Sequence, residues 1–184
     1  MRIFVGCASR ATYNPEYIEL AENIGAYIAN GNHTYVFGGC DNGLMGEVYA
    51  FAKKHGCKVI ASGVECYKDE IIRLYKDNDN VDVTIASTVN ERKNNVIENS
   101  DVLIFIPGGI GTFDEMFASI ESKRAGEHDK PIFIVNVNGY YDLLIGMLER
   151  MYSEGFASQA NREVYNICNS YEELEKELNM LESK

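Results

Sequence analysis

The amino-acid sequence predicts an α/β fold in which a doubly wound, mostly parallel sheet carries helices on both faces. Short runs of β-branched and aromatic residues alternate with longer segments of helical period along the whole chain. The most apolar run, residues 102–106, shows no alternation of polar and apolar side chains, which is typical of a strand covered on both faces. Alternating strands and helices of this kind form a parallel sheet.

The first half of the chain contains four predicted strand–helix units. Pro15 stands at a first-turn position of the first helix, and Asn30-Gly31 provides its stop. The predicted strands cover residues 2–6, 34–37, 58–61 and 81–85, and the helices cover residues 15–29, 44–55, 66–76 and 90–98.

The second half continues the alternation. Ser170-x-x-Glu173 is a capping box that opens a C-terminal helix, and leucines 174, 178 and 181 share one face of that helix. The other predicted strands cover residues 102–106, 131–135 and 164–167, and the other helices cover residues 112–123 and 140–153. The complete pattern is Rossmann-like, so ligands are expected at the carboxyl ends of the strands.

Length and composition predict one soluble domain, residues 1–184. The chain is 46% hydrophobic, and no linker, repeat or low-complexity stretch divides it. With 17 basic against 28 acidic residues, the net charge of −11 disfavours a nucleic-acid-binding surface. No apolar run is long enough to cross a membrane, and no signal-peptide pattern is present, so we expect a cytoplasmic protein. Five scattered cysteines and three isolated histidines predict reduced thiols and no metal.

Residues 37–46, FGGCDNGLMG, form a glycine-rich turn between a strand and a helix. Glycines let the backbone approach a ligand, and a helix N-terminus offers free N–H groups to an anion. We therefore take Gly38, Gly39, Gly43 and Met45 as substrate-binding candidates. The alternative is that these glycines only form a tight turn, because the segment matches neither the dinucleotide-binding nor the P-loop pattern.

Residues 107–115, PGGIGTFDE, follow the most apolar strand. Gly108, Gly109 and Gly111 can expose a row of N–H groups to phosphate oxygens, and Thr112 can cap the next helix and donate its hydroxyl to the same phosphate. Glu115 is well placed for acid–base chemistry beside that phosphate. The alternative is a structural role in which Thr112 and Glu115 form a T-x-x-E capping box.

Arg92 and Lys93 are adjacent cations at the start of a predicted helix. An arginine can make a fork of hydrogen bonds to a phosphate or a ribose oxygen. The alternative is an ordinary solvated helix face. Their helix precedes the strand that leads into residues 107–115, so we expect both cations to reach the same crevice.

Together these segments resemble the Lonely guy family of cytokinin riboside 5′-monophosphate phosphoribohydrolases, which are often mislabelled lysine decarboxylases. Residues 107–115 match the family motif PGGxGTxxE at every fixed position. Residues 37–46 resemble YGGGxxGLMG, and residues 91–93 resemble the end of MHxRK. Similarity to further family landmarks extends over residues 126–131, 136–141 and 154–156.

The sequence also departs from the family pattern. Cys40 stands where the family has a third glycine, and Val89 and Asn90 stand where it usually has Met-His. Ser122 replaces a common tryptophan, and Val64-Glu65 replaces Val-Ile-Pro. The last two changes lie where a base-recognition pocket can form, so they bear on the preferred base rather than on the phosphate and ribose chemistry.

The resemblance implies hydrolysis of the N-glycosidic bond of a purine nucleoside 5′-monophosphate, either AMP or an N6-substituted AMP of cytokinin type. It assigns catalysis to Glu115 and Arg92, with Lys93 as a more distant phosphate charge. It implies no cofactor and no metal, and a homodimer or higher homo-oligomer with contacts near the helices that carry Arg92 and Thr112.

Three other functions are weighed against this one. A non-catalytic nucleotide-binding or sensor protein of the same fold would need the glycines but not the carboxylate of Glu115. A pyridoxal-phosphate-dependent decarboxylase is rejected, because no lysine with a partner for the pyridine nitrogen is recognisable. A DNA-processing relative is disfavoured by the net charge of −11.

Overall fold

A seven-stranded parallel sheet forms the centre of the computed structural model, which describes residues 1–12, 14–76 and 78–183. The strand order is β4-β3-β2-β1-β5-β6-β7, and all neighbouring strands run parallel. This confirms the predicted doubly wound fold. The strands are β1 (Arg2–Gly6), β2 (Thr34–Phe37), β3 (Val59–Val64), β4 (Val81–Ala86), β5 (Val102–Phe105), β6 (Ile132–Val135) and β7 (Asn166–Cys168).

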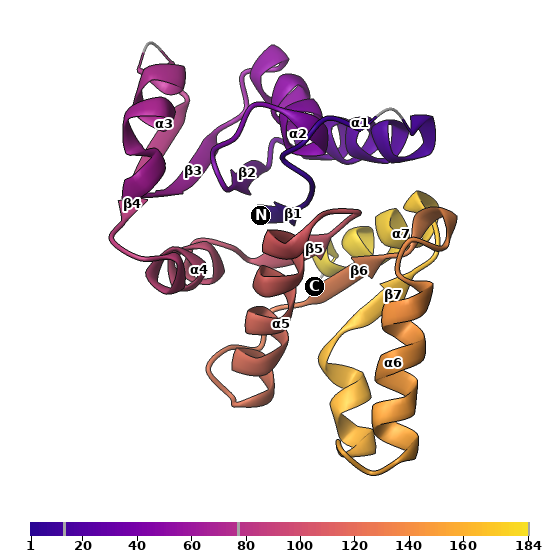
Figure 1. Ribbon diagram of the computed structural model, residues 1–184. Helices are drawn as coiled ribbons and strands as arrows, with labels where there is room; N and C mark the ends of the chain where they lie inside the picture. Colours follow the sequence, from indigo (N-terminus) through magenta and orange to yellow (C-terminus); the bar gives the residue numbers. More distant parts are fainter. Residues whose placement is uncertain (13, 77, 184) are drawn as a thin grey trace.

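Helices cover both faces of the sheet, as predicted. Leu20, Val48 and Leu174 belong to one buried cluster, which joins helices from both ends of the chain on one face. Val96 and Met116 belong to a second cluster on the opposite face. Figure 1 shows α1 and α2 on one side of the strands and α4, α5 and α6 on the other. The helices are α1 (Pro15–Asn30), α2 (Gly43–Lys54), α3 (Lys68–Tyr75), α4 (Val89–Glu98), α5 (Ile110–Arg124), α6 (Asp142–Ser153) and α7 (Tyr171–Glu182).

Three short 3₁₀ turns lie at the edges of predicted elements, where the boundaries differ from the prediction. Glu65–Tyr67 is a 3₁₀ turn ahead of α3, and Val137–Gly139 is another ahead of α6. The strand predicted at residues 164–167 is shifted, since Gln159–Val164 is 3₁₀ and β7 begins at Asn166. Short apolar runs beside tight turns do not fix such boundaries.

The order of the strands reverses between β1 and β5. The chain runs outward from β1 to β4, and α4 then carries it back to β5 on the other side of β1. Gly6 is in register with Phe105, and the Ala8 backbone N–H donates to the Pro107 carbonyl at 3.1 Å. The loops after β1 and β5 are therefore held against each other at the switch point, where sheets of this class bind ligands.

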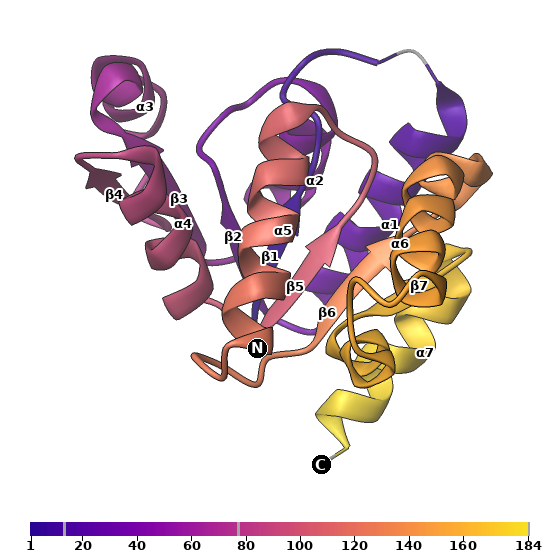
Figure 2. The ribbon, with the colours of Figure 1, turned by 60° about the horizontal axis from the view of Figure 1, so that its bottom comes forward.

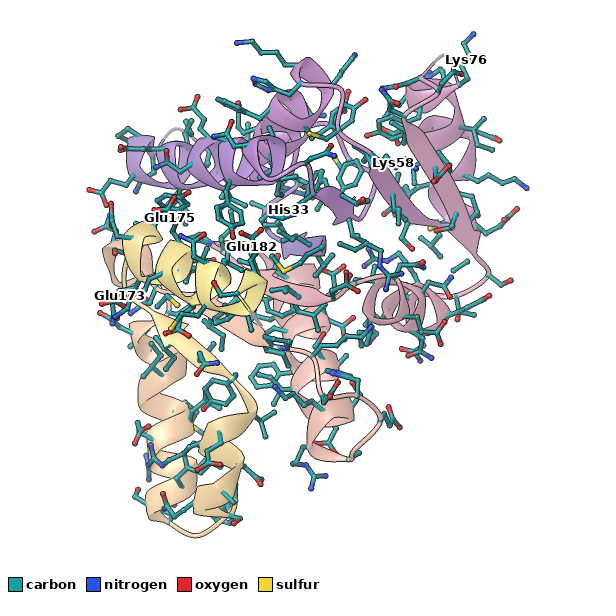
Figure 3. All side chains as sticks on the ribbon, turned by 180° about the vertical axis from the view of Figure 1, so that it is seen from behind. His33, Lys58, Lys76, Glu173, Glu175 and Glu182 are labelled. Carbon is teal, nitrogen blue, oxygen red and sulfur yellow. The ribbon has the colours of Figure 1, made fainter. Side chains whose placement is uncertain are left out.

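The C-terminal helix packs against the start of β2 and the N-terminus. In the view from behind, Glu182 at the end of α7 lies beside His33 (Figure 3), with 2.6 Å between Oε1 and Nε2. The Met1 amino group lies 3.2 Å from Nδ1 of the same ring. Burial, assisted by the Met1 ammonium, lowers the pKa of His33, and Glu182 opposes that shift. His33 therefore joins the end of the C-terminal helix to the N-terminus of the chain.

Candidate active site

A cleft of about 570 Å³ opens at the switch point of the sheet. Its floor is made by the loops after β1, β2 and β5, and the start of α3 forms one wall. The predicted site residues that line it are Gly38, Gly39, Met45, Arg92, Gly109, Gly111, Thr112 and Glu115. Most of the candidates therefore meet in one cleft, although they come from three separate stretches of the chain.

An ion pair between Arg92 and Glu115 lies in this cleft. Nη2 of Arg92 donates to Oε1 of Glu115, and the two side chains are only 15% and 8% exposed. Arg92 comes from the first half of α4 and Glu115 from the second turn of α5, and Figure 2 shows these helices side by side against the sheet. Because α4 packs against α5, it brings the guanidinium group of Arg92 to the switch point of the sheet.

Burial sets the electrostatics of Glu115. Desolvation raises the pKa of its carboxyl group above the ordinary value of 4.5, and the positive charge of Arg92 opposes the shift. A carboxylate with a raised pKa accepts a proton more readily near neutral pH. The residue therefore has the electrostatic properties of a general base.

The capping-box interpretation of Thr112 and Glu115 is wrong. Helix α5 begins at Ile110, with Gly109 as its N-cap and no side-chain cap hydrogen bond. Thr112 thus lies inside the first turn, and the carboxylate of Glu115 bonds to Arg92 instead of to the helix backbone. The helix starts two residues earlier than predicted because Gly109 itself supplies the extended cap conformation.

Gly38 makes room for the arginine. A Cβ atom on Gly38 would lie 3.0 Å from Nη1 of Arg92, closer than most side chains tolerate. Gly39 has a φ of +85°, and Tyr75 holds this turn by donating its hydroxyl to the Gly39 carbonyl at 3.0 Å. The glycines after β2 are therefore required both for the turn and for the approach of Arg92.

Gly109 and Gly111 leave open space in the cleft. A Cβ atom on either residue would meet no protein atom within 4 Å, so neither glycine is required by packing. Both lie at the N-terminus of α5, where free N–H groups and the helix dipole favour an anion. The arrangement can hold a phosphate group with Thr112 beside it.

Three predicted binding residues do not line the cleft. Lys93 donates from Nζ to Asp114 at 2.8 Å, because it follows Arg92 by one residue and so projects from a different side of α4. Gly108 lies beneath Thr112, whose Oγ1 would be 2.1 Å from a Cβ there. Gly43 has a φ of +62° and packs against the Arg10 carbonyl, which a Cβ would approach to 2.4 Å. These two glycines shape the loops rather than contact a ligand.

The sequence interpretation missed two parts of the cleft. The loop after β1 contributes Cys7, Ala8, Ser9 and Arg10, and the rule that ligands bind at carboxyl ends of strands would have found it. The wall at α3 contains no recognisable motif, and only the folded chain brings it to the cleft. Its lining residues are Tyr67, Glu70 and Ile71, and beside them lies Val64 at the end of β3, which the family resemblance had already connected with a base pocket.

Some of the residues that depart from the family pattern line the cleft, and others do not. Cys40, Val64 and Val89 line the cleft, whereas Glu65 and Asn90 do not. Ser122 lies in the last part of α5 and donates its hydroxyl to the Ser119 carbonyl, so it does not line the cleft of the single chain.

Metal ligands are not gathered in the described part of the chain. Across residues 1–12, 14–76 and 78–183, no three His, Cys, Asp or Glu side chains are grouped so as to hold a metal ion. All five cysteines are free, and burial raises the pKa of the Cys7 thiol, which directly follows β1. In the same ranges no helix is long and apolar enough to span a membrane.

Comparison with known proteins identifies the family. The family model described as "Possible lysine decarboxylase" matches residues 45–178. A cytokinin riboside 5′-monophosphate phosphoribohydrolase of Arabidopsis thaliana is 33% identical over 177 residues, which is 96% of this chain and 82% of that protein. A protein of the same name from Mycobacterium tuberculosis is 35% identical over 156 residues, or 85% of this chain and 81% of that one. The chain belongs to the Lonely guy family.

Solved structures confirm the fold of this Lonely guy protein. A molybdenum cofactor binding protein from Rippkaea orientalis superposes with a TM-score of 0.67 at 22% identity, covering 98% of this chain and 95% of that one. The molybdenum cofactor carrier protein of Chlamydomonas reinhardtii gives 0.69 at 18% identity, covering 100% and 98%. These identities establish a shared fold only. The names of the curated relatives support nucleotide phosphoribohydrolase activity at the level of the family.

Proposed function

We propose that this protein hydrolyses the N-glycosidic bond of a purine nucleoside 5′-monophosphate, AMP or an N6-substituted AMP, to release the free base and ribose 5-phosphate. The observation that carries the proposal is the buried Arg92–Glu115 pair, which shares one cleft with the open glycines of the α5 N-terminus. The printed names of the curated relatives support the same reaction.

The chemistry follows from the charges in the cleft. Cleavage of the C1′–N bond builds positive charge on the ribose ring, and the carboxylate of Glu115 stabilises that charge. Water adds its oxygen to C1′ and gives a proton to Glu115, while the bond electrons leave with the base, which then takes up a proton. Arg92 keeps the carboxylate oriented and ionised until the water binds, and it holds ribose or phosphate oxygens. No cofactor is required.

The wall at α3 supports adenine as the base. Val64 and Ile71 offer apolar surface to a purine ring, and Tyr67 offers an aromatic face. Glu70 places a carboxylate in the same wall, and a carboxylate accepts hydrogen bonds but donates none when ionised. It therefore favours a base with an amino group at its edge over a base with a carbonyl oxygen there.

A non-catalytic nucleotide-binding protein of the same fold is the alternative. A test that separates the two is incubation with AMP, an N6-substituted AMP, other nucleoside monophosphates and free adenosine, with free base and ribose 5-phosphate as the readout. We expect turnover of the monophosphates and scarcely any of adenosine, because binding of the remote phosphate positions the reacting carbon. Binding of AMP without release of adenine would favour the alternative, and equal turnover of AMP and adenosine would contradict the phosphate subsite.

We also propose a cytoplasmic homodimer or larger homo-oligomer that uses the α4 and α5 surface. Val89, Ile110 and Phe117 are large apolar side chains at least 44% exposed on these two helices, and Val89 and Ile110 also line the cleft. A second copy covering them would complete the site at the subunit interface. Five free cysteines suit a reducing compartment. A fully active monomer in light scattering would contradict the assembly.

A further inference from the structure

We propose that Arg10, in the loop after β1, supplies the positive charge that binds the 5′-phosphate. This inference rests on the proposed function and identifies a binding residue that lies outside every motif discussed above. It also takes the place of Lys93, to which the family resemblance had assigned a more distant phosphate charge.

The distribution of charge in the cleft leads to Arg10. Its charged lining residues are Arg10, Glu70, Arg92 and Glu115. Arg92 is already neutralised by Glu115, and Lys93 is bound to Asp114 outside the cleft. Among the described residues that line the cleft, Arg10 is thus the cation without an acidic partner.

A phosphate monoester needs such a charge in this protein. It carries between one and two negative charges near neutral pH, whereas the chain as a whole carries a net charge of −11 and repels anions at long range. The N-terminus of α5 contributes only about half a positive charge. A free guanidinium in the same cleft adds a full charge and a planar fork of donors that matches phosphate oxygens.

The backbone around Arg10 is held from both sides. On the β5 side, the Ala8 N–H donates to the Pro107 carbonyl at 3.1 Å, which sets the loop beside the glycines of α5. On the β2 side, the Met45 N–H donates to the Ala8 carbonyl at 3.2 Å, and Gly43 fits against the Arg10 carbonyl only because it lacks a Cβ. The base of the Arg10 side chain is therefore fixed at the switch point while its exposed guanidinium group stays free to bind.

The test is calorimetric titration with ribose 5-phosphate, inorganic phosphate and ribose, none of which contains a bond that the enzyme would cleave. We expect Arg10→Ala to weaken binding of ribose 5-phosphate by about 10- to 100-fold, the loss typical of one charge-assisted fork, and to leave ribose unaffected. Inorganic phosphate should lose affinity in parallel. Arg10→Lys should recover part of the loss. Arg73→Ala, which removes an exposed arginine of α3 outside the cleft, should change nothing.

Unchanged affinity for ribose 5-phosphate in Arg10→Ala would overturn the inference, and so would a similar loss caused by Arg73→Ala. The result is independent of catalysis. If the wild-type protein binds ribose 5-phosphate through Arg10 but releases no base from AMP, the inference stands and the proposed function fails. If it hydrolyses AMP and Arg10→Ala has the wild-type KM, the proposed function stands and the inference fails.

Discussion

Gly111 allows the stability and the activity of the protein to be separated. It occupies the first turn of α5, lines the cleft, and would accept a Cβ atom without any contact within 4 Å. A glycine inside a helix makes the fold less stable than an alanine would by about 0.5–1 kcal/mol, because a glycine residue loses more conformational entropy on folding. Gly111→Ala is therefore expected to stabilise the fold and raise Tm by about 1–4 °C.

The same substitution should impair substrate binding. The added methyl group occupies space that we assign to the phosphate, so hydrogen bonds from the α5 N-terminus to the phosphate lengthen or break. Charge-assisted hydrogen bonds contribute about 1.5–3 kcal/mol each, which corresponds to a rise in the KM for AMP of about 10- to 100-fold. Gly111→Ala should therefore stabilise the fold and weaken the binding of AMP, a combination that is not expected if the glycine has only a structural role.

The assay compares thermal unfolding and steady-state hydrolysis of AMP in three proteins: wild type, Gly111→Ala and Gly146→Ala. Gly146 is a matched control, because it is an exposed helical glycine of α6 with equally open surroundings and lies outside the cleft. Gly146→Ala should raise Tm with an unchanged KM. If Gly111→Ala kept the wild-type KM, or if it lowered Tm, the assignment of this space to phosphate would be refuted.

Three further outcomes follow from the charges. In a pH–rate profile, the kcat for AMP should decline on the acid side with a midpoint above pH 4.5, because burial raises the pKa of Glu115. Arg92→Ala removes the opposing positive charge and should move this midpoint to higher pH. A midpoint that moves to lower pH would contradict the pairing of Arg92 with Glu115. Glu70→Gln should reduce the ratio of kcat/KM for AMP over IMP by about 10-fold, since an amide can donate to the carbonyl of IMP; an unchanged ratio would remove Glu70 from base selection. Because the pKa of His33 is lowered, the folded state favours the neutral ring. The contribution of His33 to the free energy of unfolding is therefore complete above pH 6.5 and is lost as the pH falls below that value. His33→Gln should flatten that dependence in urea unfolding at several pH values, and an equally steep loss in the variant would assign it to other groups.

Most of the fold could be predicted from the sequence, because strands and helix ends are marked by local patterns of residues. The unbroken apolar run of residues 102–106 predicts a covered strand, and β5 (Val102–Phe105) is the strand beside β1 at the centre of the sheet. Pro15 and the capping box at Ser170 mark the first and last helices to within one residue. Boundaries failed where 3₁₀ turns intervene, as at Gln159–Val164, since such turns have no distinct periodicity.

Site residues could be predicted where they belong to a recognisable local motif. They could not be predicted where tertiary packing determines which side chains line the cleft. Glu115 and Arg92 were predicted correctly as cleft residues. Lys93 was not, because neighbours in a helix point in different directions and Asp114 of α5 lies within reach of its amine. Arg10 and the wall at α3 carry no local pattern, so only the assembled sheet brings them to the cleft.

The most direct test of the proposed reaction is the turnover of AMP by Glu115→Gln, measured together with its affinity for ribose 5-phosphate. Gln keeps an acceptor for Arg92 but cannot stabilise a cationic ribose or take a proton from water. We predict that kcat falls by roughly 100-fold or more, whereas the affinity for ribose 5-phosphate stays close to that of the wild type. Wild-type turnover by Glu115→Gln would contradict a catalytic role for this carboxylate and leave the protein as a nucleotide-binding module.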